Sequence, residues 1–95
     1  MVLEKQRAGI DAVDQQIVAL FEERMAWVKQ VIEVKLENGM DILDTSREAQ
    51  VIDKAVSRLE NKDLEPELRD FFTEMMRVSR AYQAKIAQSS KSQVE

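Results

Sequence analysis

The feature that most constrains this chain is a long helical stripe of apolar residues that is interrupted by cations. Between residues 3 and 36 there is no proline and a single glycine, so little opposes a continuous helix. Arg24 stands in the stripe on the same seven-residue spacing as Ile17 and Val31, and Lys35 lies at its edge. A desolvated cation is costly unless an anion meets it, so the pattern predicts a bound anion. The apolar members of the stripe are Leu3, Ile10, Val13, Ile17, Leu20, Phe21, Val28, Val31 and Val34.

Composition limits what such a chain can do. Its 95 residues suit one small domain, and an apolar share of 44% is enough for a core. The net charge of −4, with 34% charged residues of mixed sign, argues against nucleic-acid binding, which needs a clustered basic face. No apolar run approaches the roughly 20 residues of a membrane span, and neither a signal segment nor a cysteine is present. We therefore expect a cytoplasmic protein that binds neither nucleic acid nor membrane.

The absence of both histidine and cysteine narrows the chemistry further. The usual soft-metal ligands are missing, as are the nucleophile and base pairs that these residues supply. The two isolated glycines, Gly9 and Gly39, form no phosphate-binding loop. An enzyme built from this chain must work with arginine, lysine, carboxylates, amides and hydroxyls, which suit anion binding and the stabilisation of shifting charge.

Turn and cap signals predict an all-α fold. The first helix is predicted from about residue 3 to residue 37, and it ends at Asn38-Gly39, a pair suited to a left-handed helix terminus. Thr45 and Glu48 fit the capping-box pattern, which predicts that a short second helix starts there.

The rest of the chain predicts a long third helix. A mostly polar loop covers residues 61–65, and Pro66 suits the first turn of the helix that follows. Residues 89–95 are small and polar, so we expect a frayed tail there. The expected organisation is one helical domain over residues 1–88, followed by that tail.

The first helix is too long for a compact monomer. About 34 residues at ~1.5 Å each span roughly 50 Å, whereas a compact 95-residue domain is roughly 30 Å across. Two shorter helices cannot cover the whole apolar stripe, but a second copy of the chain, packed antiparallel or intertwined, would cover it. We therefore expect an intertwined homodimer.

Spacing along the first helix groups two cations and separates a third. Arg24 and Lys35 face the same way, since 11 positions are about three turns with ~20° of rotation. They lie about 16 Å apart along the axis and could hold a small molecule between them. Arg7 is ~25 Å from Arg24 and rotated by about 100°, so it could serve only the site of another subunit. Arg7 also suits a solvated position, Lys35 suits the negative end of a helix dipole, and Arg24 could pair with an acid of a neighbouring helix.

Polar residues interrupt the other two helices as well. Ser79 and Gln83, one turn apart, continue the apolar face of the third helix. Asp44, Arg47 and Glu48 cluster at the start of the second. Simpler interpretations exist: the two acids suit helix caps, Ser79 can bond back to its own helix, and Gln83 suits a rim. Spacing thus predicts an all-helical dimer with an anion pocket, without identifying the anion.

The order of these polar residues closely resembles the all-helical chorismate mutase family. The local strings QRAGIDAVDQQIVALFEERM, LDTSREAQVI and SRAYQ carry the resemblance, which covers roughly residues 4 to 88. It implies an intertwined dimer in which the long first helix is shared between two active sites. The matching positions are Arg7, Arg24, Lys35, Asp44, Arg47, Glu48, Ser79 and Gln83.

The resemblance also implies a reaction. Chorismate, a dicarboxylate, would rearrange to prephenate in a unimolecular pericyclic step of aromatic amino-acid synthesis that needs no base, nucleophile, metal or cofactor. By similarity, Arg24 and Arg7 of the partner subunit would pair with the two carboxylates, and Ser79 would assist one of them.

The remaining residues would act at the ring and the ether by the same similarity. Lys35 and Gln83 would donate to the ether oxygen, which gains negative charge as its bond breaks. Glu48 would accept a hydrogen bond from the ring hydroxyl with Asp44 nearby, and Arg47 would help to orient the ligand and the acids.

Two other functions compete with this one. Isochorismate–pyruvate lyase resembles the same family in fold and anion-binding residues, although the acidic cluster at Asp44, Arg47 and Glu48 favours the mutase. A non-catalytic helical dimerisation module would instead pair its cations across an interface. That module predicts that Arg24 and Lys35 meet protein carboxylates and leave no enclosed cavity.

Overall fold

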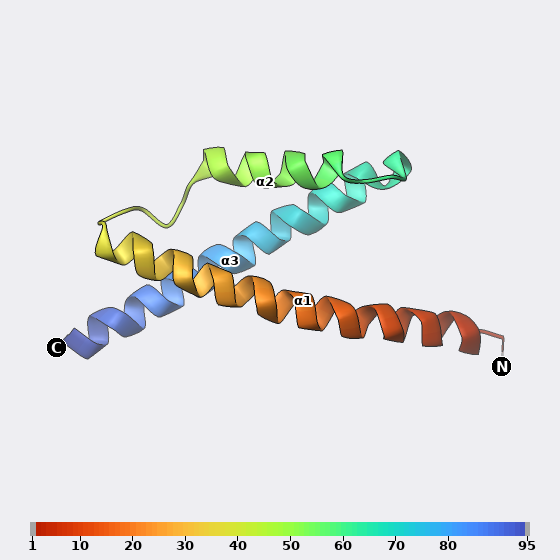
Figure 1. Ribbon diagram of the computed structural model, residues 1–95, viewed down its shortest axis with the longest axis horizontal. Coiled ribbons are helices and arrows are strands. Elements are labelled where there is room, and N and C mark those ends of the chain that lie inside the picture. The colour runs from red at the N-terminus through yellow and green to blue at the C-terminus, as the bar shows by residue number, and fades with distance from the viewer. Residues whose placement is uncertain (1, 95) are drawn as a thin grey trace.

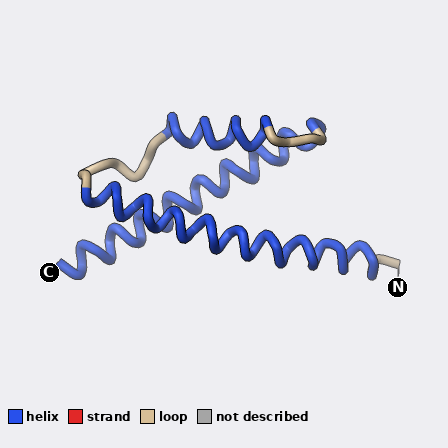
Figure 2. The backbone as a smooth tube through the Cα atoms, in the orientation of Figure 1, coloured by secondary structure: helices blue, strands red, loops and turns tan. Residues whose placement is uncertain are grey.

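A computed structural model describes residues 2–94, with side chains described through Ser90, and every regular element within that range is helical (Figure 1). Helix α1 covers Glu4–Glu37 and helix α2 covers Thr45–Ser57. A 3₁₀ turn, η1, at Lys62–Leu64 leads directly into helix α3, Glu65–Val94. Figure 2 shows that only short loops connect the three helices. The predicted all-α fold of a long, a short and a second long helix is confirmed.

Helix α3 holds the other two helices in place. It packs against both α1 and α2, whereas within residues 2–94 α1 and α2 make no packing contact with each other. The core is small, and Ile32 of α1 is its one fully enclosed large side chain among the described residues. The buried apolar side chains are Val28, Ile32, Ala55, Val56 and Met76. The separation of α1 from α2 is therefore set by how each of them packs on α3.

The N-terminal half of α1 is left uncovered by its own chain. Every described residue from Val2 to Glu23 is exposed, and Figure 1 shows this half running out past the other two helices. The chain measures 58 × 28 × 15 Å with a radius of gyration of 17.0 Å, against about 12 Å for a compact domain of this length. The apolar stripe predicted from the sequence therefore has no core of its own here. Its exposed members in this half are Leu3, Ile10, Val13, Ile17, Leu20 and Phe21.

Helix α1 ends as its sequence predicts. Gly39 has a φ of 63°, and the Met40 N–H bonds to the Lys35 carbonyl at 2.9 Å. This is the Schellman arrangement, in which a residue with positive φ lets the chain fold back over the last helical turn. The Asn38 amide also donates to the Val34 carbonyl at 2.8 Å. The reversal brings the following loop back towards Lys35.

The cap of α2 differs from the prediction. The helix begins at Thr45 as expected, but its N-cap is Asp44, whose carboxylate accepts from the Arg47 N–H at 3.0 Å. The capping-box interpretation, with Thr45 as the cap, was therefore wrong by one position, whereas the interpretation of Asp44 as a helix cap is confirmed. Aspartate is among the most favourable N-cap residues and is preferred over threonine at this position. Because Asp44 caps the helix, the Glu48 side chain is not needed for a capping box and can contact another residue.

Helix α3 begins one residue before Pro66, which lies in the first turn as predicted. It extends through most of the segment expected to be a tail and ends at Val94, while Glu95 lies outside the described residues. None of the helices in the described range is long and apolar enough to cross a membrane.

Candidate active site

A cavity of about 240 Å³ lies where the three helices come together, with α3 as their common wall. Of the eight residues singled out from the sequence, seven line it, and Arg7 is the exception. The cavity is partly open to solvent, and its volume lies below the range of roughly 300–1,000 Å³ that is usual for drug-sized ligands. It therefore suits a small metabolite. The lining residues are Arg24, Trp27, Val28, Val31, Lys35, Ile42, Asp44, Arg47, Glu48, Val51, Met76, Ser79, Arg80 and Gln83.

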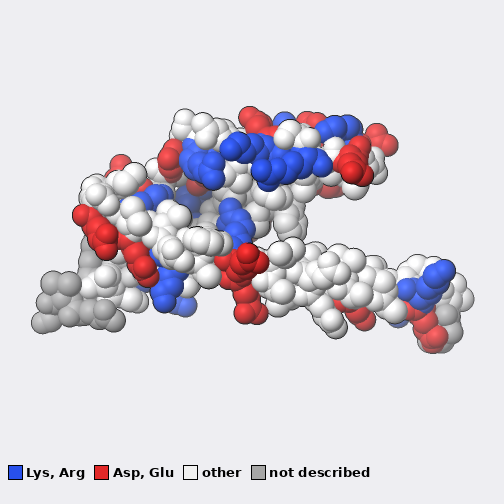
Figure 3. All heavy atoms as spheres, in the orientation of Figure 1, with Lys and Arg blue, Asp and Glu red and all other residues white. Residues whose placement is uncertain are grey.

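The charge of the cavity is opposite to that of the chain. Its lining includes four cations and two carboxylates, an excess of two positive charges, in a chain with a net charge of −4. Figure 3 shows cationic side chains gathered over α2 on the side that faces α1. Low-dielectric walls strengthen this local field, so the cavity favours anions over cations.

Arg24 is held across the interface of α1 and α3. Its Nη1 donates to the Ser79 hydroxyl at 2.7 Å, and that hydroxyl in turn donates to the Met75 carbonyl at 2.9 Å. Ser79 is buried, and its hydroxyl proton is donated within its own helix. The hydroxyl oxygen can therefore accept a hydrogen bond from Arg24. Burial, followed by repulsion from the Arg47 guanidinium, lowers the pKa of Arg24. Two guanidiniums that repel each other in this way form a ready site for an anion.

Lys35 is fixed by two acceptors near the end of α1. Its ammonium donates to the Ile42 carbonyl at 2.8 Å and to the Gln83 Oε1 at 3.3 Å. An ammonium has three N–H donors, so one remains for a ligand. Because the buried Gln83 turns its oxygen towards Lys35, its NH₂ group is also left to donate. The two side chains thus present neighbouring donors to the same part of the cavity.

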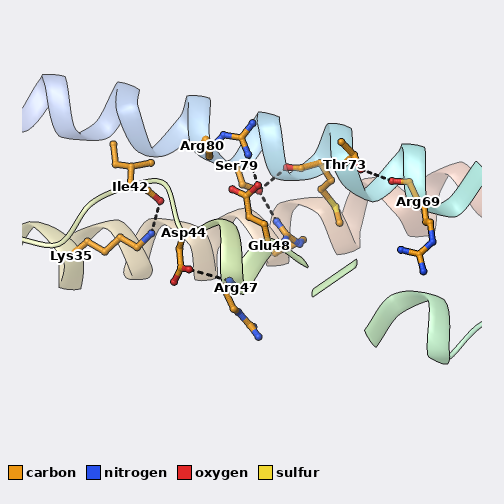
Figure 4. A network of polar contacts seen from close by, with 11 residues as sticks. Lys35, Ile42, Asp44, Arg47, Glu48, Arg69, Thr73, Ser79 and Arg80 are labelled. Atoms are coloured by element: carbon orange, nitrogen blue, oxygen red, sulfur yellow. Dashed lines mark hydrogen bonds and ion pairs between the residues drawn. The ribbon is translucent and has the colours of Figure 1, made fainter. Parts of the chain in front are cut away.

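The acids of α2 have different roles. Figure 4 shows Asp44 at the start of the helix, where its carboxylate is occupied by the Arg47 N–H. Glu48, one turn further on, points across to α3, where its Oε1 accepts from Nη1 of Arg80. Asp44 is thus mainly a cap that lines the rim, whereas Glu48 is a polar group of the cavity.

Two polar contributors to the cavity could not be assigned from the sequence. Arg80 follows Ser79 and lies one turn after Met76, so helical spacing places it at the pocket but gives it no partner. The Ile42 carbonyl, which anchors Lys35, is a backbone group that any residue would supply. Trp27, Val28 and Val31 complete the apolar part of the α1 wall.

Arg7 lies away from this cavity. It is exposed on the uncovered half of α1, as the rotation and distance along the helix predict, and it does not line the pocket of its own chain. The seven other candidates come together without it.

Comparison with known proteins gives a match to a protein family. The family model for chorismate mutase type II matches residues 6–84, a range that begins one residue before Arg7 and ends one residue after Gln83. All eight candidate residues fall inside it. Neither a curated protein nor a solved structure gives a match. The match covers most of the chain and describes an all-helical family, in agreement with the observed fold: the chain belongs to the chorismate mutase type II family.

Proposed function

We propose that this protein is a chorismate mutase that rearranges chorismate to prephenate without a cofactor. The observation that carries the proposal is the pair of donors on Lys35 and Gln83 inside a cavity with two excess positive charges. Incubating the purified protein with chorismate and following its loss and the appearance of prephenate tests it. Offering isochorismate separately, and looking for salicylate and pyruvate, tests the lyase alternative. A protein that consumes neither substrate would contradict the proposal.

The proposed catalysis has two physical parts. The flexible enolpyruvyl arm must be held over the ring, which converts a rare conformation into the bound one. Charge that develops on the ether oxygen as its bond breaks must then be stabilised more strongly than in the ground state. Arg24, oriented by Ser79, would hold a substrate carboxylate for the first part. The free N–H of Lys35 and the NH₂ of Gln83 would supply the second.

The proposal includes a homodimer, which the exposed heptad pattern of α1 supports. Leu3, Ile10, Ile17, Arg24 and Val31 recur every seven residues, and so do Val13, Leu20, Trp27 and Val34. All of these except Arg24 are exposed. Two positions in every seven are the signature of a seam between paired helices. An apolar hollow of about 360 Å³ beside Phe71 and Phe72 adjoins this seam.

One antiparallel register pairs most apolar members of the stripe with one another. When Ile17 of one chain faces Leu20 of the partner subunit, Ile10 faces Trp27 of the partner subunit and Leu3 faces Val34 of the partner subunit. In that register Arg7 of the partner subunit lies opposite Gln30, about midway between Arg24 and Lys35 along α1. The same arrangement would thus bring a further cation to the level of the cavity along α1. We propose that each site is completed in this way, on a catalytic domain over residues 1–88.

The dimerisation-module alternative makes a different prediction about the cations. It requires Arg24 and Lys35 to meet carboxylates across the interface; within one chain, among the described residues, their side chains bond instead to the Ser79 hydroxyl, the Ile42 backbone carbonyl and the Gln83 amide. Both cations also line a cavity, which that alternative does not expect. These observations favour a catalytic site. The cytoplasmic location expected from the sequence stays a prediction.

Replacing Arg24 with alanine should weaken both binding and turnover. Removing one partner of a desolvated charge pair typically costs enough to lower kcat/KM by about a hundredfold or more. Steady-state kinetics with chorismate measure the effect, and we expect KM to rise as well as kcat to fall. Arg69→Ala, which removes an exposed arginine outside the cavity, is the matched control. An unchanged KM in Arg24→Ala would refute its proposed contact with a carboxylate.

Replacing Gln83 with glutamate should make the activity depend on pH, with higher activity at lower pH. At neutral pH a carboxylate cannot donate and would repel the ether oxygen, so we expect activity to fall about a hundredfold. Protonation below neutrality restores a donor, so activity should recover as the pH is lowered. The wild-type amide needs no proton, and its pH profile should lack this recovery. Profiles of kcat/KM for both proteins measure the difference, and a steep acid rise in the wild type would contradict the role of Gln83.

A further inference from the structure

We propose that Arg80 is a positioning residue that fixes the Glu48 carboxylate so that its second oxygen can accept a hydrogen bond from the ring hydroxyl of the substrate. The inference rests on the proposed mutase function, and it assigns a role to a cavity residue that has none in the proposed mechanism. It is drawn from the contact between Arg80 and Glu48, which joins α3 to α2 across the cavity (Figure 4).

The first argument concerns the geometry of the pair. Nη1 of Arg80 donates to Oε1 of Glu48 at 2.5 Å. The side chains are 33% and 22% exposed, so solvent screens this pair less than a surface ion pair. With Oε1 occupied, Oε2 keeps its lone pairs for a ligand hydroxyl. The guanidinium also offsets the negative charge that Glu48 would otherwise present to an incoming dicarboxylate.

The second argument concerns what else could hold Glu48 in place. Helices α1 and α2 have no close backbone approach within the described range, and no described residue of α1 makes a hydrogen bond or ion pair with Glu48. Arg80 is the only hydrogen-bond partner of the Glu48 carboxylate among the described residues. Without it, a glutamate has three side-chain torsions free to turn towards solvent. The direction of the carboxylate therefore depends on α3.

A different role would use Arg80 as a direct ligand for a substrate carboxylate. The structure favours the positioning role, because the guanidinium is already engaged with Glu48, whereas Arg24 and Arg47 lie in the same cavity and make no ion pair among the described residues. Figure 4 shows Arg47 directed away from Glu48. The two roles make different predictions for a substrate that lacks the ring hydroxyl.

The experiment compares chorismate with an analogue whose ring hydroxyl is replaced by hydrogen. The measured quantity is the kcat/KM for chorismate divided by the kcat/KM for the analogue. Effects of losing a charge that act equally on both substrates cancel in this ratio. Arg80→Met is expected to lower this ratio by about tenfold to a hundredfold, the range of a hydrogen bond to a charged group. In a Glu48→Gln background, the same substitution should leave the ratio within about threefold, because the acceptor through which it acts has been altered.

Arg77→Met is the matched control. Arg77 lies on the same helix and also pairs with a glutamate, Glu74, but this pair is exposed and outside the cavity. Its ratio and its kcat/KM for chorismate should stay at the wild-type values. Thermal unfolding is recorded for every variant, and Arg80→Gln replaces Arg80→Met in the comparison if the latter does not fold.

The outcomes separate the inference from the function on which it rests. A wild-type protein that does not convert chorismate overturns both. An active wild type in which Arg80→Met lowers kcat/KM equally for the two substrates overturns the positioning role alone and assigns Arg80 to a carboxylate. An active wild type in which the substitution changes neither value also overturns the positioning role.

Discussion

Replacing Lys35 with alanine is expected to lower kcat by about two to three orders of magnitude, the usual cost of removing one preorganised donor from developing negative charge. The ammonium is held by the Ile42 carbonyl and the Gln83 Oε1, so its third N–H is already aimed before substrate arrives. Water that enters in place of the side chain must reorganise during the reaction and stabilises the ether oxygen less. Because the charge develops mainly in the transition state, KM should change much less than kcat.

Single-turnover and steady-state kinetics with chorismate measure this effect. Lys29→Ala is the matched control, because Lys29 is an exposed lysine of the same helix that does not line the cavity. Its kcat should stay within about twofold of the wild-type value, as is usual for a surface substitution. Near-normal turnover in folded Lys35→Ala would refute the role assigned to this residue.

Mixing two inactive variants is expected to restore activity if the sites are shared. Arg7→Ala and Lys35→Ala should each be nearly inactive alone. In a mixed dimer, the subunit with an intact Lys35 receives an intact Arg7 from the other subunit. One of the two sites of the mixed dimer is therefore complete. Random pairing of equal amounts makes half of the dimers mixed, so activity should return to about a quarter of the wild-type value. Refolding the two variants together from denaturant, and then assaying chorismate loss, measures the recovery.

The control for this mixture uses two residues of the same subunit. Lys35→Ala mixed with Gln83→Ala should give no recovery, because every site in every mixed dimer then lacks one of the two donors. Light scattering on each sample checks that Arg7→Ala still forms dimers, since Arg7 lies beside the apolar seam and not in it. If the first mixture stays as inactive as its components while both form dimers, Arg7 does not complete the site of the other subunit.

The helices were predictable because their signals are local. Asn38-Gly39 sets the end of α1 through a positive φ that glycine tolerates, and Pro66 fits only the first turn of α3. The cap of α2 was less certain because Asp44 and Thr45 are both good N-cap residues, and only the backbone decides between them.

The placement of the candidate residues was predictable where a single helix carries the argument. The spacing of Arg24 and Lys35 put them on one face, and rotation set Arg7 apart; the structure agrees in all three cases. Contacts between helices were not accessible in the same way. The pairing of Arg80 with Glu48 depends on how α3 is turned relative to α2, which no spacing within either helix determines.

The exposed N-terminal half of α1 would affect how the protein behaves on dilution. Most of the stability of a helix in a protein comes from the packing of its apolar face, so residues 4–23, which their own chain leaves exposed, would gain much of their order from the second chain. Folding, association and assembly of the catalytic centre would then be one equilibrium governed by mass action. In such a protein the number of competent sites is set by how much of it is present as well as by how well each chain folds.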